Sequence, residues 1–198
     1  MSDITVLGGG RVGASLAGAL TRAGHEVTVA TRSPGAAADA VRTARIVINA
    51  TPGAGSLERL AALRAELRGK ILVDVSNATV DGPDGLPAGL LYPGSSLAER
   101  LQEALPETLV VKTLNTMLHS VMTAPATLAQ TPTAFLSGTD PEAKQIVRGL
   151  LLDLGWQQEW ITDLGGIETA RAVEAAILFV PHVIRSTGFA PFAISIAR

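Results

Sequence analysis

Short runs of consecutive apolar residues alternate along this chain with longer segments whose apolar residues recur every three or four positions. Short, continuously apolar runs between helical segments are typical of parallel strands that are buried on both faces of a sheet. The predicted strands comprise residues 4–7, 26–30, 45–49, 70–75, 108–112, 133–137 and 156–161.

The longer segments predict helices. In the first of them, Val12, Leu16 and Leu20 follow helical spacing, and Gly24 is a suitable helix stop. The predicted helices comprise residues 12–23, 34–43, 57–67 and 141–154, and a helix-rich tail follows from about Gly166.

Strands that alternate with helices predict an α/β fold with a doubly wound, mostly parallel sheet and a short helical C-terminal part. The C-terminal part has few charges, so we expect its apolar surface to be covered by its own sheet or by a partner subunit. Residues 81–87 form a turn-rich loop that is long enough to be the rim of a site.

Composition narrows the possible functions. Apolar residues make up 47% of the chain and charged residues 17%, which argues against disorder, and a net charge of −2 leaves no basic surplus for nucleic acid. The chain has no cysteine, which excludes disulfides and cysteine nucleophiles. His25, His119 and His182 lack metal-ligand spacing, so we expect no metal site. We find neither a signal peptide nor a membrane-spanning run, and we expect a cytoplasmic protein.

A glycine-rich turn carries the strongest functional pattern. It directly follows the first predicted strand and opens the first predicted helix, which is the context that a dinucleotide-binding G-x-G-x-x-G motif requires. The first glycine allows a tight turn, the second lets a diphosphate approach the backbone, and the third lets the helix pack on the strand. The alternative is a glycine-rich turn without a ligand. The motif comprises Gly8, Gly9, Gly10, Arg11, Val12 and Gly13.

The end of the second predicted strand distinguishes between the two nicotinamide dinucleotides. An NAD site usually has Asp or Glu about 20 residues after the glycines, to bind the ribose hydroxyls. This chain has Thr31, Arg32 and Ser33 there instead. A guanidinium flanked by two hydroxyls suits a 2′-phosphate, which favours NADP, although Arg32 could also be a solvated turn residue.

Polar loops follow the next three predicted strands. Ligands of open α/β sheets bind at the carboxyl ends of the strands, so we expect these loops to surround the ribose and the nicotinamide. Ordinary turn chemistry is the alternative, because Asn, Thr, Pro and Gly are common loop residues. The candidates are Ala50, Thr51 and Pro52 after the third strand, Asn77 after the fourth, and Asn115, Thr116 and Met117 after the fifth.

No acid–base pair stands out among the other polar residues. Lys112 ends a strand and could donate a proton, whereas Asp74 reads as a hydrogen-bonded strand-end residue. Arg171 and Glu174 have the spacing of a local helical ion pair. The absence of an acid–base pair suits direct hydride transfer between two rings, which needs alignment more than a catalytic side chain.

The chain resembles NADPH-dependent oxidoreductases related to coenzyme F420:NADP oxidoreductase. The resemblance is carried by residues 5–13, 23–27, 31–33, 110–116, 137–140, 143–144, 153–156, 166–171 and 174. It implies an NADP-binding Rossmann domain, here residues 1–162, and a small helical extension, residues 163–198, which packs on the domain and in a homodimer interface. It also implies hydride transfer between NADP and a deazaflavin that lies against the loops after the third and fifth strands.

Asn115 departs from the deazaflavin enzymes of this group, which have a histidine there. Relatives with Asn include the nucleotide-binding domains of ferric reductases. A flavin or ferric acceptor therefore stays open beside coenzyme F420, as do an NADP-sensing protein without turnover and a scaffold. Hydroxyacid dehydrogenases, pyrroline-carboxylate reductases and imine reductases need a much larger helical second domain than the 37 or so residues that follow the last predicted strand.

Overall fold

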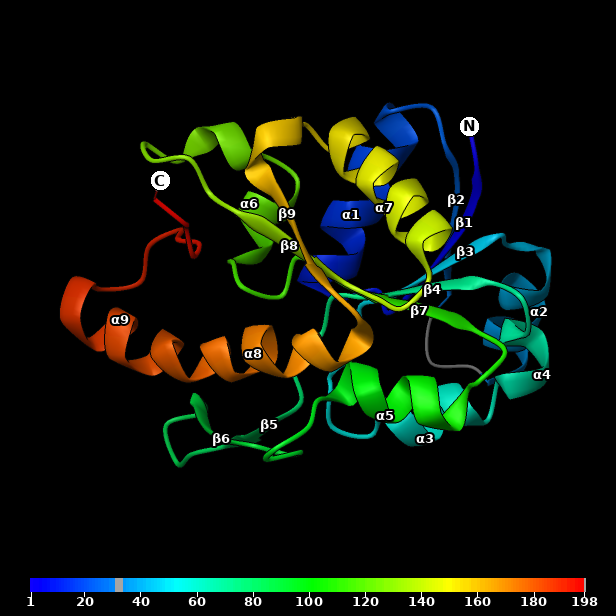
Figure 1. Cartoon of the computed structure of the whole chain (residues 1–198), viewed down its shortest axis with the longest axis horizontal. Coiled ribbons are helices and arrows are strands. Elements are labelled where there is room, and N and C mark those ends of the chain that lie inside the picture. Colours follow the sequence, from blue (N-terminus) through cyan, green and yellow to red (C-terminus); the bar gives the residue numbers. More distant parts are fainter. Residues whose placement is uncertain (31–33, 198) are drawn as a thin grey trace.

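A computed structural model of the chain describes residues 1–30 and 34–197. Within them, seven strands form one sheet in the order β2-β1-β3-β4-β7-β8-β9, and β5 and β6 form a separate hairpin (Figure 1). The strands of the sheet are β1 (Asp3–Leu7), β2 (Glu26–Ala30), β3 (Ile46–Asn49), β4 (Ile71–Asp74), β7 (Leu109–Lys112), β8 (Ala134–Ser137) and β9 (Ile161–Gly165). The hairpin strands are β5 (Thr79–Asp81) and β6 (Pro87–Leu90).

The sheet is parallel from β2 through β7, then β8 runs antiparallel to β7, and β9 runs parallel to β8. The predicted doubly wound, mostly parallel α/β fold is therefore confirmed. Because β8 reverses direction, it begins at the edge of the sheet where β7 ends. The connection between them, residues 113–133, therefore stays at that edge and contains α6 (His119–Met122) and the 3-10 turn η1 (Pro125–Thr127).

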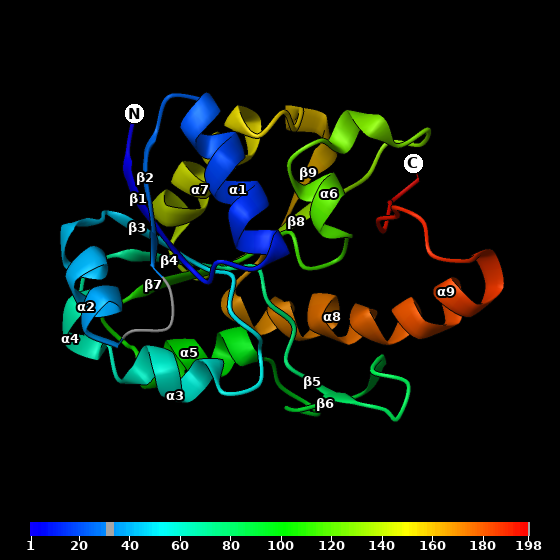
Figure 2. The same cartoon turned by 180° about the vertical axis from the view of Figure 1, so that it is seen from behind.

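Helices cover both faces of the sheet, as both views show (Figures 1 and 2). On one face Leu20 and Val147 are buried against the sheet, and on the other Leu67 and Leu101 are buried. The first face carries α1 (Arg11–Arg22), α6 and α7 (Pro141–Asp153). The second carries α2 (Pro34–Thr43), α3 (Ser56–Ala61), α4 (Arg64–Leu67) and α5 (Leu97–Ala104).

The C-terminal part is helical, as predicted, as far as Thr187. It comprises η3 (Ile167–Thr169), α8 (Ala170–Ala175), η4 (Ala176–Phe179) and α9 (Val180–Thr187). These elements form one arm that extends past the hairpin, after which the chain turns back toward α6 (Figure 1). Among the described residues, we find no helix with the length and apolarity that a membrane span requires.

Two predicted elements differ from the observed ones. The strand expected at residues 156–161 is wrong: Gly155, with φ +92°, ends α7, and the Trp156 and Gly155 amides donate to the Leu151 and Leu152 carbonyls. The chain then passes through η2 (Gln158–Trp160), and β9 begins only at Ile161. The helix expected at residues 57–67 is divided into α3 and α4.

The hairpin and α5 have no counterpart among the predicted elements. The turn-rich loop at residues 81–87 connects the two hairpin strands. Ser96 caps α5, since its hydroxyl accepts a hydrogen bond from the Glu99 amide.

Leu136 tests the placement of β8 in the core. Its side chain is fully buried, so Leu136→Ala should leave a cavity and lower the free energy of unfolding by about 2–5 kcal/mol. Leu152→Ala is the matched control, because Leu152 is 45% exposed on α7, and we expect a change within about 0.5 kcal/mol. Urea unfolding followed by circular dichroism measures both. Equal losses would contradict the placement of β8.

Candidate functional site

The glycine-rich turn joins β1 to α1 at the centre of the molecule, and two of its glycines are required by close packing. Gly8 has φ +108°, and a Cβ added there would lie 2.7 Å from the Ala50 carbonyl oxygen. A Cβ added at Gly13 would lie 1.9 Å from the carbonyl oxygen of Gly8. The turn is therefore packed against both the start of α1 and the loop that follows β3.

Gly10 has a different environment, because a Cβ built on it meets no atom within 4 Å. Gly10 is the N-cap of the twelve-residue helix α1, and no side chain in the described part of the chain caps it. The first amides of a helix have no intrahelical partner, and the helix dipole places partial positive charge there. The open space at Gly10 therefore fits an anionic group such as a diphosphate.

The turn lies at the switch point of the sheet, since β1 has β2 on one side and β3 on the other. The Ala50 amide donates to the Leu7 carbonyl across this point, with 2.9 Å between nitrogen and oxygen. Ligands of open α/β sheets bind in the crevice at such a point. Thr51 is half-buried and Pro52 is exposed in the same loop, whereas the candidates Thr31, Arg32 and Ser33 lie outside the described residues.

The polar loops that the sequence singled out contact one another in series. A Cβ added at Gly53, after β3, would lie 2.2 Å from the Asn77 carbonyl oxygen, after β4. Asn77 Nδ2 donates to the Asn115 carbonyl, and Asn115 Nδ2 donates to Asn77 Oδ1, each over 2.9 Å. The structure therefore brings the loops after β1, β3, β4 and β7 together along one edge of the sheet.

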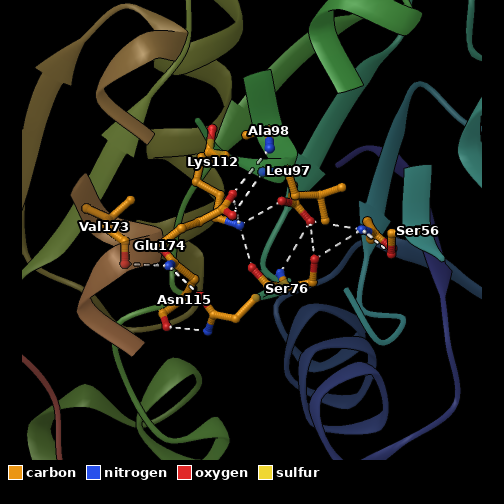
Figure 3. Close-up of polar contacts among 12 residues, drawn as sticks. Ser56, Ser76, Leu97, Ala98, Lys112, Asn115, Val173 and Glu174 are labelled. Atoms are coloured by element: carbon orange, nitrogen blue, oxygen red, sulfur yellow. Dashed lines mark hydrogen bonds and ion pairs between the residues drawn. The ribbon is translucent and has the colours of Figure 1, made fainter. Parts of the chain in front are cut away.

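Asn115 also connects this edge to the C-terminal arm. Its Nδ2 donates to the Val173 carbonyl of α8 over 2.9 Å, so both amide hydrogens are used within the protein (Figure 3). Asn115, Thr116 and Met117 are all buried. The Asn115 side chain therefore holds the loop after β7 in place.

A row of polar residues crosses the sheet beneath these loops. The strand register pairs Asn49 with Asp74 and Asp74 with Lys112, each at the carboxyl end of its strand. Asn49 Nδ2 donates to Asp74 Oδ1 over 2.8 Å, and the Ser76 hydroxyl donates to the same oxygen over 2.7 Å. Thr51 Oγ1 donates to Asn49 Oδ1 over 2.6 Å, which attaches the loop after β3 to the row.

Lys112 is the centre of this row and is completely buried (Figure 3). Its Nζ lies 2.7 Å from Asp74 Oδ2 and 3.0 Å from Glu174 Oε1, and it also donates to the Ser76 carbonyl. Burial alone lowers the pKa of the Lys112 ammonium, but the Asp74 and Glu174 carboxylates outweigh it and raise that pKa above its usual value of 10.5. Lys112 is therefore charged at neutral pH.

Glu174 extends the network to two helices. Its carboxylate accepts hydrogen bonds from the Leu97 and Ala98 amides at the start of α5, over 2.9 and 3.2 Å. Because Glu174 belongs to α8, one ion pair fixes α8 and α5 to the carboxyl ends of β4 and β7 (Figure 3).

Three expectations about single residues are settled here. Asp74 is a hydrogen-bonded strand-end residue, as predicted. Lys112 is enclosed by its partners, which leaves it unsuited to donate a proton to a substrate. The expected Arg171–Glu174 pair is wrong, because Arg171 pairs with Glu99 of α5 and Glu174 faces Lys112.

The histidines have other surroundings. His25 Nε2 lies 3.0 Å from Asp153 Oδ2, which joins the end of α1 to the end of α7, and His119 begins α6. In the described part of the chain, no three His, Cys, Asp or Glu side chains form a group that could hold a metal ion. An open cavity of about 750 Å³ is lined by residues of the hairpin loop and β6, of η4 and of α9, among them Asp84 and Arg185, which form an ion pair.

Lys112→Met tests whether the buried cluster depends on the ammonium. The substitution leaves two carboxylates buried without their cation, and we expect a loss of about 3–5 kcal/mol in the free energy of unfolding. Arg100→Met breaks the exposed pair with Glu103 and should cost about 0.5 kcal/mol.

In the wild type, the raised pKa means that the Lys112 contribution to stability is complete below pH 10.5 and is lost only as the pH rises through the folded-state pKa. Urea unfolding of the wild type and of both variants at pH 7 measures the two losses of stability, and unfolding of the wild type at alkaline pH measures the loss of the Lys112 contribution. Equal losses in Lys112→Met and Arg100→Met would contradict the dependence of the cluster on the ammonium.

Comparisons with known proteins agree with this geometry. Residues 3–39, which contain the glycine-rich turn, match the family model for NADP oxidoreductase, coenzyme F420-dependent. An F420-dependent NADP reductase of Methanocaldococcus jannaschii is 30% identical over 140 residues, which are 69% of this chain and 60% of that protein. The alignment thus spans less than two thirds of this relative.

Solved structures extend the likeness over the whole chain. A crystal structure from Arthrobacter sp. FB24, provisionally named an F420-dependent NADP-reductase, is 39% identical and has a TM-score of 0.90, with 100% of both chains covered. A hypothetical protein of Sinorhizobium meliloti, SMa0349, is 26% identical with a TM-score of 0.64, over 85% of this chain and 88% of that one. The chain therefore belongs to the family of coenzyme F420-dependent NADP oxidoreductases, whose name implies both NADP and coenzyme F420.

Proposed function

We propose that this protein binds NADP(H) across the glycine-rich turn and transfers a hydride between NADP(H) and a deazaflavin, coenzyme F420. The observation that carries this proposal is the open space at Gly10, which lies beside the uncapped N-terminus of α1 at the switch point of the sheet. A dinucleotide diphosphate has the charge and size that such a position accepts.

Each part of the dinucleotide then has its own group of residues. The diphosphate lies against Gly8, Gly9, Gly10, Arg11, Val12 and Gly13, and the 2′-phosphate lies with Thr31, Arg32 and Ser33. The nicotinamide end lies by Ala50, Thr51, Pro52 and Asn77, because these loops follow β3 and β4. Asn115, Thr116 and Met117 position the side from which the hydride acceptor approaches.

Hydride transfer requires that the nicotinamide ring and the acceptor ring be aligned with each other. When bound, the nicotinamide would supply hydride chemistry at its C4 carbon, with the electron pair moving with the hydride to or from the acceptor ring and a proton exchanged with solvent. The protein's part is to hold both rings in contact and to exclude water. The buried charged groups fit this part, since Asp74, Lys112 and Glu174 are bound to one another and fix the surrounding loops.

We further propose that the protein is a cytoplasmic homodimer, in which residues 1–162 form the NADP-binding domain and residues 163–198 form a C-terminal extension in the interface. Large apolar side chains support an interface at the arm and the hairpin. Phe179 and Phe189 are 66% and 69% exposed, and Val80 of β5 is 52% exposed. Analytical ultracentrifugation would test the dimer.

A titration followed by an acceptor addition tests the proposed activity. NADPH is titrated by calorimetry with NADH in parallel, and oxidised coenzyme F420 is then added while the NADPH absorbance is followed. We expect tighter binding of NADPH than of NADH, and oxidation of NADPH when the deazaflavin is added. Binding without oxidation by the deazaflavin contradicts the acceptor, and FMN and ferric citrate added next distinguish another reductase from a protein that only senses NADP. Absence of nucleotide binding contradicts the whole proposal.

Gly10→Val tests the diphosphate position. A Cβ at Gly10 meets no protein atom within 4 Å, so a valine side chain there should occupy the open space, and the stability should be kept while the affinity for NADPH and for NADH is lost. Ala14→Val adds similar bulk at an exposed position one turn further along α1 and should leave both affinities unchanged. Calorimetric titration measures the affinities, and retained binding in Gly10→Val would mean that the diphosphate lies elsewhere.

Arg32→Ala tests the 2′-phosphate contact that the sequence predicts. Loss of a charge-assisted hydrogen bond should weaken NADPH binding about 10- to 100-fold and leave NADH binding unchanged, since only NADPH has this phosphate. Arg22→Ala, at the end of α1, controls for the loss of one positive charge. An equal loss for both nucleotides would refute the role of Arg32.

A further inference from the structure

The last described residues of the chain return to the loop that follows β7. The chain turns back from α9 toward α6 in both views (Figures 1 and 2). The Leu118 amide donates to the Phe192 carbonyl over 3.0 Å, and the Ile194 amide donates to the Thr116 carbonyl over 3.1 Å. These bonds place Met117 opposite Ala193 in an antiparallel bridge.

The other side of this segment is bound to the residues that precede β8. The Thr133 amide donates to the Ile194 carbonyl over 3.1 Å, and the Ile196 amide donates to the Thr133 hydroxyl over 3.0 Å. The Ser195 hydroxyl donates to the Thr131 carbonyl over 2.6 Å. Residues 192–196, here called the C-terminal strap, thus lie between the loop after β7 and the start of β8.

The loop that the strap holds has a costly conformation. Leu114 has φ +60°, and it is the one non-glycine residue with a positive φ in the described part of the chain. The hydroxyls of Thr113 and Thr116 are buried and have no hydrogen-bond partner among the described residues. A left-handed leucine and unpaired buried hydroxyls each destabilise the folded loop, so such a loop persists only when the surrounding structure holds it.

Two sets of contacts hold this loop. From the interior, Asn115 is fixed by Asn77 and by the Val173 carbonyl. From the outside, the strap fixes the carbonyl of Thr116 and the amide of Leu118. Strained backbone that is held from two sides is typical of sites that are built in advance for a ligand.

We propose that the C-terminal strap is a positioning element for hydride transfer, which holds Thr116 and Met117 on the side of the site that the hydride acceptor approaches. This inference rests on the proposed function. It assigns the strap a role in transfer and none in nucleotide binding, because its hydrogen bonds reach the loop after β7 and residues 131–133, whereas the glycine-rich turn follows β1.

Ile194→Pro tests the strap, because proline removes the amide that donates to the Thr116 carbonyl. Ala193→Pro is the matched control, because in the described part of the chain the Ala193 amide donates to no acceptor and proline there removes no hydrogen bond. We expect Ile194→Pro to lower kcat for NADPH oxidation by coenzyme F420 about 10- to 100-fold per NADPH-binding site, as misplacement by about 1 Å can. The dissociation constant of NADPH should stay unchanged in both variants.

Thr133→Val provides a second, milder test, since it removes the hydroxyl that accepts from the Ile196 amide while keeping the side-chain shape. We expect a smaller fall in kcat than in Ile194→Pro. Equal kcat per binding site in the wild type and all three variants would overturn the proposal. So would a loss of activity in Ile194→Pro that only parallels a loss of NADPH stoichiometry, because that result reports unfolding.

Hydrogen exchange separates this proposal from the proposed function. Amides of residues 113–122 should exchange faster in Ile194→Pro than in Ala193→Pro, whether or not the protein turns over. If the wild type binds NADPH but none of the added acceptors oxidises it, the proposed function is refuted, and with it a role for the strap in hydride transfer. If the wild type is active and the amides of residues 113–122 exchange at the same rate in the wild type and in the variants, only the positioning role of the strap is refuted.

Discussion

The structure depends on the burial of one ammonium group between two carboxylates. Lys112 has no exposed surface, and Asp74, Glu174 and the Ser76 carbonyl surround it. Burial of three ionised groups is expensive, and it is tolerated because each is hydrogen-bonded: Glu174 to the first amides of α5, and Asp74 to Asn49 and Ser76. The network joins three strand ends and two helices at the edge of the sheet where the candidate site lies. Removal of Lys112 would leave both carboxylates buried without their cation, and Glu174 is the member that connects α8 of the C-terminal arm to the strand ends.

Above this cluster, backbone packing arranges the loops in the order in which a dinucleotide would meet them. Gly8 contacts Ala50, Gly53 contacts Asn77, and Asn77 is bound to Asn115, which is itself bound to α8. The open position at Gly10 lies at one end of this series, and the strained loop around Leu114 lies at the other. Hydride transfer needs fixed rings rather than mobile acids and bases, and a set of interlocked loops on a buried ionic base meets that need.

The sequence correctly predicted those features that depend on local patterns of residues, namely individual strands, helices and the glycine motif. The strand at residues 26–30 and the helix at residues 34–43 have the expected bounds, and the glycine motif lies at the expected junction of strand and helix. Contacts that depend on strand register could not be read in the same way. Asn49, Asp74 and Lys112 meet because they occupy the same row of three parallel strands, and Glu174 reaches that row from 62 positions further along the chain. The local spacing of Arg171 and Glu174 therefore predicted the wrong ion pair. The pairing of the strap with Thr116 could not be predicted, because it produces no periodic pattern of apolar and polar residues in the sequence.

A crystal structure with NADP⁺ bound tests the central claim most directly. We predict that the diphosphate lies against Gly10 at the N-terminus of α1, with the nicotinamide ring in contact with the loops after β3 and β4 and one face open toward the loop after β7. A nucleotide bound in this place but with its ring turned away from Asn77 would contradict the assignment of the acceptor side. A diphosphate bound anywhere other than the glycine-rich turn would contradict the account as a whole.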